Sequence, residues 1–117
     1  MKENILKDKS FQFAIRIINL FKHLKIKHGE YVISNQLVRS GTAVGALVRK
    51  AEYAKSTKDF IHKFSIALKE ANETKYWLDL LKASKYLNIK MHDSIIIDCD
   101  ELLKLLTATK KTSKRIL

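Results

Sequence analysis

The chain has 117 residues, of which 46% are hydrophobic and 30% charged, so it has the size of one globular domain and is too apolar for a disordered protein. Its formal net charge of +11 predicts attraction to polyanions, above all nucleic acid. A solubility role explains that charge equally well, because most of it comes from lysine. No apolar run reaches the length of a membrane span or a signal sequence. The single cysteine, Cys99, excludes an internal disulfide, and we expect a cytoplasmic protein.

The first predicted helix runs from Ser10 to Lys25. Its polar residues fall on one narrow face, and apolar side chains cover most of the rest of its surface. A helix on the outside of a bundle normally has a narrower apolar stripe. The width of this one predicts that a neighbouring subunit covers it on a second side. Gly29 follows in a turn, where it can take the left-handed conformation that ends a helix.

The second predicted helix, from Tyr31 to Ala54, has unusually small residues in its middle. Gly41 and Gly45 lie one turn apart, although glycine inside a helix costs up to ~1 kcal/mol relative to alanine. Their spacing predicts that another helix approaches closely there. A weak or kinked helix is the alternative interpretation.

The third predicted helix begins at Ser56, with Asp59 completing a capping box, and reaches as far as Tyr86. After a turn at 88–92, a fourth helix begins near Asp93 or Ser94, and a basic tail at about 108–117 is expected to fray. Apolar and small residues follow the 4-3 spacing of a bundle seam in both helices. These seam residues are Phe60, Phe64, Ala67, Ala71, Thr74, Leu78 and Leu81 in the third helix and Ile95, Cys99, Leu102 and Leu106 in the fourth.

Four helices with short connections predict an all-α fold, an antiparallel up-down-up-down four-helix bundle in which residues 1–117 form one domain. Proline is absent and glycine occurs three times, which agrees with long helices. We expect neither a metal site nor a cofactor. The four histidines lie in different segments, and phosphate-loop and di-iron motifs are missing.

Two clusters of polar residues could carry chemistry. Arg16 and His23 share a face of the first helix with a spacing that some α-helical ribonucleases use, histidine serving as acid or base and arginine holding phosphate. Such short matches are common in basic proteins. The block 70–74 (EANET) lies beside the third seam, where we expect structural hydrogen bonds to another helix rather than catalysis.

The candidate nucleic-acid-binding residues are Arg39, Arg49, Lys50 and Lys55, on the second helix and its exit. Arginine suits phosphate because its guanidinium can bond two oxygens at once. We see no aromatic platform beside these cations, so the sequence predicts contacts to the nucleic-acid backbone. An ordinary solvated face is the alternative.

The run Gln36–Ala46 (QLVRSGTAVGA) closely resembles a signature of the four-helix bundle protein family, also called the ribosomal RNA intervening-sequence protein family. A second matching block runs from Asp59 to Thr74 and continues with Tyr76-Trp77-Leu78. The resemblance extends from about Phe11 to Leu106, nearly the whole chain.

This resemblance implies an antiparallel bundle that assembles into a ring-like homopentamer. Similar proteins, the accessory variability determinants of diversity-generating retroelements, form basic pentameric barrels that bind a reverse transcriptase and nucleic acid. The chain departs from the family pattern at Ala43, Leu47 and Lys50, where serine, asparagine and glutamate are usual, and this makes the helix more apolar and more basic than the pattern.

We therefore expect a binding and assembly protein rather than an enzyme. The first hypothesis is a homo-oligomeric scaffold, pentameric as the resemblance implies, whose basic surface binds structured RNA, or DNA. The alternatives are a protein-binding adaptor for a polymerase or reverse transcriptase and, with less support, a helical ribonuclease that uses Arg16 and His23.

Overall fold

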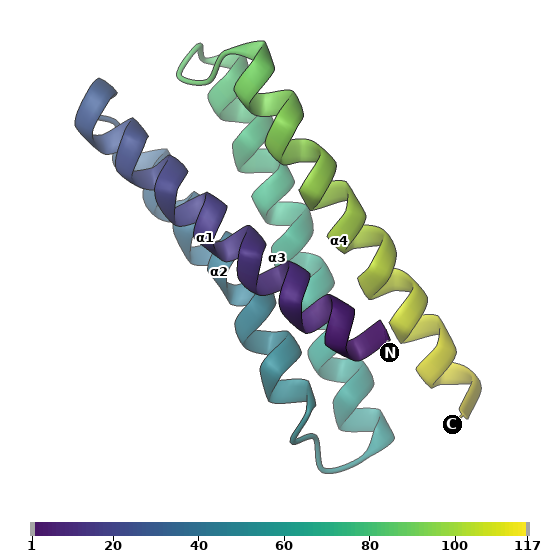
Figure 1. Cartoon of the computed structure of the whole chain (residues 1–117). Coiled ribbons are helices and arrows are strands. Elements are labelled where there is room, and N and C mark those ends of the chain that lie inside the picture. Colours follow the sequence, from purple (N-terminus) through teal and green to yellow (C-terminus); the bar gives the residue numbers. More distant parts are fainter. Residues whose placement is uncertain (1, 117) are drawn as a thin grey trace.

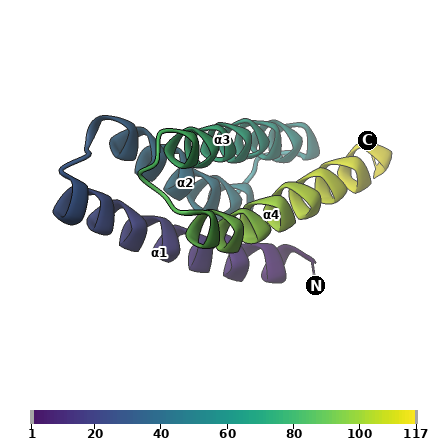
Figure 2. The ribbon, with the colours of Figure 1, turned by 90° about the horizontal axis from the view of Figure 1, so that it is seen from above.

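The computed structural model describes the backbone of residues 2–116 and the side chains of residues 5–115. Its helices are α1 (Lys2–His28), α2 (Val32–Ala51), α3 (Thr57–Ala83) and α4 (Ile89–Ile116). Successive helices run in opposite directions in a bundle of 47 × 21 × 19 Å, which confirms the predicted all-α up-down-up-down architecture (Figure 1). Seen from above, α2 lies between α1 and α3, and α4 packs on α3 and α1 (Figure 2).

Helix α1 begins at Lys2, so the predicted start at Ser10 is wrong. Leu6 and Ser10 are almost completely buried and lie on the same face as Phe13 and Ile17. This continuous buried face favours two further helical turns. Apolar periodicity alone missed them, because lysines and an aspartate surround Leu6 in the sequence.

Gly29 ends α1 as predicted, with a left-handed φ of 63°. The Gly29 amide donates to the Lys25 carbonyl (3.1 Å), the bond of the αL capping motif, and the Glu30 amide donates to the Leu24 carbonyl (3.2 Å). The Glu30 carboxylate is buried and accepts hydrogen bonds from the amides of Ile33 (2.7 Å) and Ser34 (3.0 Å). This carboxylate therefore satisfies two of the free amides in the first turn of α2 and opposes the positive end of its dipole.

The two glycines of α2 lie against α1, which confirms the predicted close approach. A Cβ at Gly41 would lie 2.9 Å from both γ carbons of Ile17, and one at Gly45 would lie 3.3 Å from the Ser10 carbonyl oxygen. Helix α2 ends at Ala51 rather than at Ala54. After it, three backbone hydrogen bonds that each span three residues tighten the chain into a turn.

Gly41→Ala is expected to lower the free energy of unfolding by about 1–3 kcal/mol, because overpacking at Ile17 outweighs the gain of up to ~1 kcal/mol in helix propensity. Urea unfolding measures the change. In an Ile17→Ala background the cost should shrink or reverse, because the γ carbons are gone. An equal cost in both backgrounds would contradict this assignment.

Helix α3 is capped as predicted, since the Ser56 hydroxyl oxygen accepts a hydrogen bond from the Asp59 amide (3.1 Å). The Asp59 carboxylate accepts from the Lys55 amide (3.1 Å), one residue before the position expected for a capping box. The seam residues of α3 and α4 are buried, apart from a half-buried Phe60.

Helix α4 begins at Ile89, so the predicted start near Asp93 or Ser94 is wrong. The Asn88 side-chain oxygen accepts from the Met91 amide (2.8 Å) and so caps the helix where the sequence suggested only a turn. The basic tail that the sequence predicts at about 108–117 continues α4 to Ile116 and buries Thr109 and Ser113 along its seam, and Leu117 lies outside the described residues. Within the described part of the chain, no helix has the length and apolar character that a bilayer span requires.

Candidate nucleic-acid interface

Arg39 projects from α2 onto α3, where two carboxylates hold its guanidinium. Its Nη1 lies 3.1 Å from Glu70 Oε2, and its Nη2 pairs with Glu73. The Glu73 carboxylate also accepts a hydrogen bond from the indole of Trp77 (2.9 Å). These contacts neutralise Arg39 locally, so a phosphate would have to compete with both carboxylates.

The Trp77 indole and the Arg39 guanidinium together lower the pKa of the Glu73 carboxyl. Because the folded pKa lies below the unfolded one, this carboxylate stabilises the fold above the ordinary glutamate pKa of about 4.3, and that contribution is lost as the pH falls through the folded value. The fluorescence of Trp77, the single tryptophan, should therefore titrate with a midpoint below about 4.3. Glu73→Gln should remove this transition, whereas Asp8→Asn, a change in an exposed acid outside this network, should leave it in place.

The block 70–74 has the structural role that the sequence predicts. Besides the two glutamates that meet Arg39, Thr74 places its hydroxyl oxygen 2.9 Å from that of Ser40, and both side chains are fully buried. The Asn72 amide donates to Leu68 of its own helix (3.2 Å), so it takes no part in the contact between helices.

The other three predicted cations lie toward the end of the bundle that holds the α2–α3 connection. Arg49 is exposed and its guanidinium stacks over the Phe11 ring, 5.1 Å from the centroid. Lys50 and Lys55 are exposed, and neither forms an ion pair among the described side chains. The structure thus groups Arg49, Lys50 and Lys55 at one end of the bundle. Arg39 differs from them because two carboxylates hold its guanidinium.

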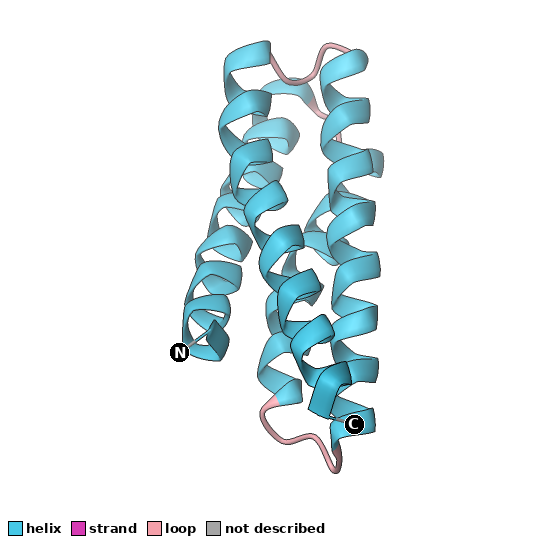
Figure 3. Cartoon of the chain, turned by 90° about the vertical axis from the view of Figure 1, so that its right-hand side faces the viewer, coloured by secondary structure: helices cyan, strands magenta, loops and turns pink. Residues whose placement is uncertain are grey.

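The last turns of α4 add further positive charge at the same end (Figures 1 and 3). Ser113 lines a small surface hollow together with residues of the α2–α3 connection, so the two segments are neighbours. No acid follows Glu101 in the sequence. We call this surface the basic end; it comprises Arg49, Lys50, Lys55 and Lys58 of the α2–α3 segment and Lys110, Lys111, Lys114 and Arg115 of α4.

Two carboxylates near the basic end are already paired. Glu52 forms an ion pair with Lys7 (2.8 Å), and Asp59 forms one with Lys63 (2.8 Å). Most other acids lie along the middle of α3 and α4, where they meet cations of neighbouring helices or of their own. The basic end is therefore left with a strong excess of positive charge.

Arg16 and His23, the residues of the ribonuclease hypothesis, line one groove between α1 and α4. Arg16 is engaged there, because its guanidinium lies 2.6 Å from Asp98 Oδ2 and 2.9 Å from Ser94 Oγ. His23 packs edge-on against His28, with ring centroids 5.9 Å apart. Arg16 and His23 therefore share one groove, but the Arg16 guanidinium is already bonded to a carboxylate.

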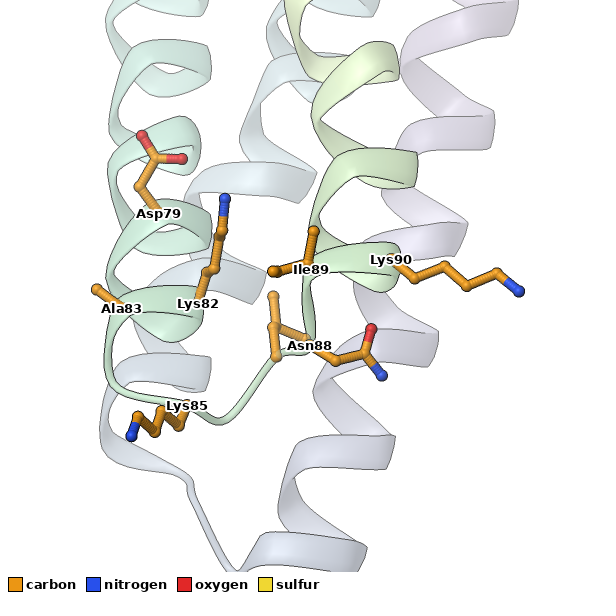
Figure 4. Close-up of a pocket in the computed structure, with 8 residues that line it drawn as sticks. Asp79, Lys82, Ala83, Lys85, Asn88, Ile89 and Lys90 are labelled. Carbon is orange, nitrogen blue, oxygen red and sulfur yellow. The ribbon is translucent and has the colours of Figure 1, made fainter.

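A hollow with a volume of about 980 Å³ lies at the opposite end, beside the α3–α4 connection. Lys85 and Lys90 extend away from it to opposite sides, and Asp79 lies along α3 (Figure 4). Asp79 pairs with His92 (2.7 Å). Because these groups do not converge, the hollow is a surface depression rather than a catalytic site.

Cys99 is fully buried, and desolvation raises the pKa of its thiol to about 12. A thiol held protonated in this way is a packing residue rather than a nucleophile. Across the described residues, no cluster of three or more histidine, cysteine or acidic side chains could hold a metal ion.

Helix α1 exposes an apolar stripe on the side away from the bundle core. Phe11, Ile15 and Ile18 remain 47%, 40% and 37% exposed at a spacing of four and three residues, which places them on one face. We call these three residues the α1 stripe. The sequence predicts a wide apolar surface on this helix, and the structure places the α1 stripe next to Arg49.

Fold and surface together define a small, basic, helical-bundle protein. A family model described as "23S rRNA-intervening sequence protein" matches residues 2–108, and the chain belongs to that family, which confirms the resemblance seen in the sequence. No curated protein matches the chain. A crystal structure of a protein of unknown function from the S23 ribosomal protein family of Bacteroides thetaiotaomicron is similar, with 51% identity, a TM-score of 0.94, and coverage of 95% of this chain and 99% of that one. Neither description names a catalytic activity.

Proposed function

We propose that the protein is a non-enzymatic, homo-oligomeric scaffold that binds structured RNA through the basic end. The observation that carries the RNA part is the excess of cations at that end, where the nearby acids Glu52 and Asp59 are paired with Lys7 and Lys63. Phosphate contacts by such cations are strong and independent of base sequence. The name of the family, which refers to intervening sequences of 23S rRNA, agrees with an RNA partner.

Self-association is supported by the α1 stripe. Three large apolar side chains on one helical face, each 37–47% exposed, favour a partner surface over water. The family resemblance implies five copies in a ring. Assembly would also multiply the basic ends, and several weak phosphate contacts on one particle bind far more tightly than one.

The test is binding of the purified protein to an RNA hairpin across a salt series, with the molecular mass determined in the same buffers. We expect an oligomer, and an affinity that falls steeply as salt rises. A protein that ignores the hairpin even at low salt would rule out the RNA part. A monomeric mass at every protein concentration would rule out the scaffold.

A protein-binding adaptor is the second candidate, and it rests on the opposite end of the bundle. Ile26, Val32 and Ile89 are 85%, 67% and 66% exposed near the α1–α2 and α3–α4 connections. Exposed aliphatic side chains suit a protein partner, such as a polymerase, better than a polyanion. Recovery of one specific protein without RNA would favour this function.

A further inference from the structure

Tyr53 lies in the α2–α3 connection, within the basic end, and is 85% exposed. Its ring has no aromatic or cationic neighbour among the described side chains, whereas Tyr76 packs on Trp77 and Tyr86 on His28. We propose that this ring stacks on an unpaired nucleobase, so that the basic end takes a single-stranded segment or loop of an RNA. The proposal rests on the proposed function and specifies which part of an RNA the site binds.

The backbone holds Tyr53 in a fixed position, although its side chain is free. The amide of Tyr53 donates to the Lys50 carbonyl (3.1 Å), and the amides of Glu52 and Ala54 donate to Arg49 (3.2 Å) and Ala51 (3.2 Å). These bonds tighten the end of α2 into a short turn. A ring projecting from a fixed turn loses little entropy when a base stacks on it, because only two side-chain torsions must be restrained.

Cations surround the ring on both sides in the sequence. Arg49 and Lys50 precede it by four and three residues, and Lys55 follows by two. The nearby acid, Glu52, is neutralised by Lys7. A base on the ring would therefore have its flanking phosphates beside cations, which is the combination that proteins use to bind single strands.

Tyr31, at the opposite end, provides a contrast. It is 59% exposed, and its neighbour Val32 is exposed as well. The exposed surroundings of Tyr31 are therefore partly aliphatic. Tyr31 serves as the matched control, because it offers an exposed ring outside the basic end.

The experiment compares two probes at low salt, a twelve-nucleotide oligoadenylate and an abasic ribose-phosphate chain of the same length. We expect the full-length protein to prefer oligoadenylate and Tyr53→Ala to weaken that binding about fivefold or more, since stacking on one aromatic ring is worth at least that much. Tyr53→Phe should keep the wild-type affinity, and Tyr31→Ala should change nothing. None of these variants should alter binding of the abasic chain.

Equal affinity for the two probes, or oligoadenylate binding that survives Tyr53→Ala, would overturn the stacking proposal. In either case steep, salt-dependent binding of the RNA hairpin would leave the proposed function intact. A wild-type protein that binds no probe and no hairpin would overturn both. Because Tyr53 is almost wholly exposed, its replacement should leave the unfolding transition unchanged, which the same samples can verify.

Discussion

Exchanging Ile15 and Ile18 for glutamate is expected to convert the proposed oligomer into folded monomers. Both side chains belong to the α1 stripe and are 40% and 37% exposed, so the bundle itself tolerates polar groups there. In a self-association interface the same change removes part of the roughly 1.5–3 kcal/mol that full burial of an isoleucine is worth, and it introduces unpaired buried charge. The dissociation constant should rise at least about a hundredfold. Sedimentation or light scattering at several concentrations gives the mass.

Ile97→Glu is the matched control for this pair of changes. Ile97 is 68% exposed on α4, away from the α1 stripe, so its replacement adds charge to the surface without touching the proposed interface. The control should keep the wild-type mass. If the Ile15 and Ile18 variant also keeps it, with an oligomeric wild type, the α1 stripe does not form the interface.

Much of the fold follows from periodicity. The seams of α3 and α4 could be predicted because both alternate four and three residues over several turns, and the Gly41–Gly45 pair could be predicted because small residues inside a helix need a packing reason. The ends of the helices are harder to predict from the sequence. The buried side chain of Leu6 extends α1, and the cap formed by Asn88 extends α4. Neither feature repeats along the sequence, so periodicity does not detect it.

The sequence indicates which types of residue form the candidate site. It gives less information about which of these cations lie together. Arg39 and Arg49 are alike in sequence, yet Arg39 faces Glu70 and Glu73 across the α2–α3 interface while Arg49 lies over Phe11. Which arginine meets an acid depends on the rotation of α2 against its neighbours, a property of tertiary packing. The different surroundings of Arg39 and Arg49 can be predicted only when it is known which helices pack against each other.

The contribution of α4 to the basic end shows the same limit. The sequence predicts a fraying tail for its last cations, because lysine-rich ends carry no apolar signal. The buried Thr109 and Ser113 continue the seam with polar side chains, which hydrophobic patterns overlook. The sequence also gives no sign that Tyr53 is an aromatic platform, because the predicted second helix includes it, whereas α2 ends at Ala51 and Tyr53 lies in the turn that follows.

Replacing Arg49, Lys50 and Lys55 together by glutamine should weaken binding of the RNA hairpin about a hundredfold at 0.1 M salt, because each lost phosphate contact removes close to one unit from the slope of log affinity against log salt. The slope itself should become shallower by about 2–3 units. The three side chains are exposed and their carboxylate neighbours are paired elsewhere, so circular dichroism should show an unchanged bundle.

The matched control removes the same charge from the other end, with Lys25, Lys27 and Lys90 replaced by glutamine. These lysines are exposed and form no ion pair among the described side chains. If overall charge alone attracts RNA, the two triple variants will lose affinity equally and both slopes will change alike. A loss confined to the first variant would instead assign the phosphate contacts to the basic end, since long-range attraction depends on net charge and direct contacts depend on position.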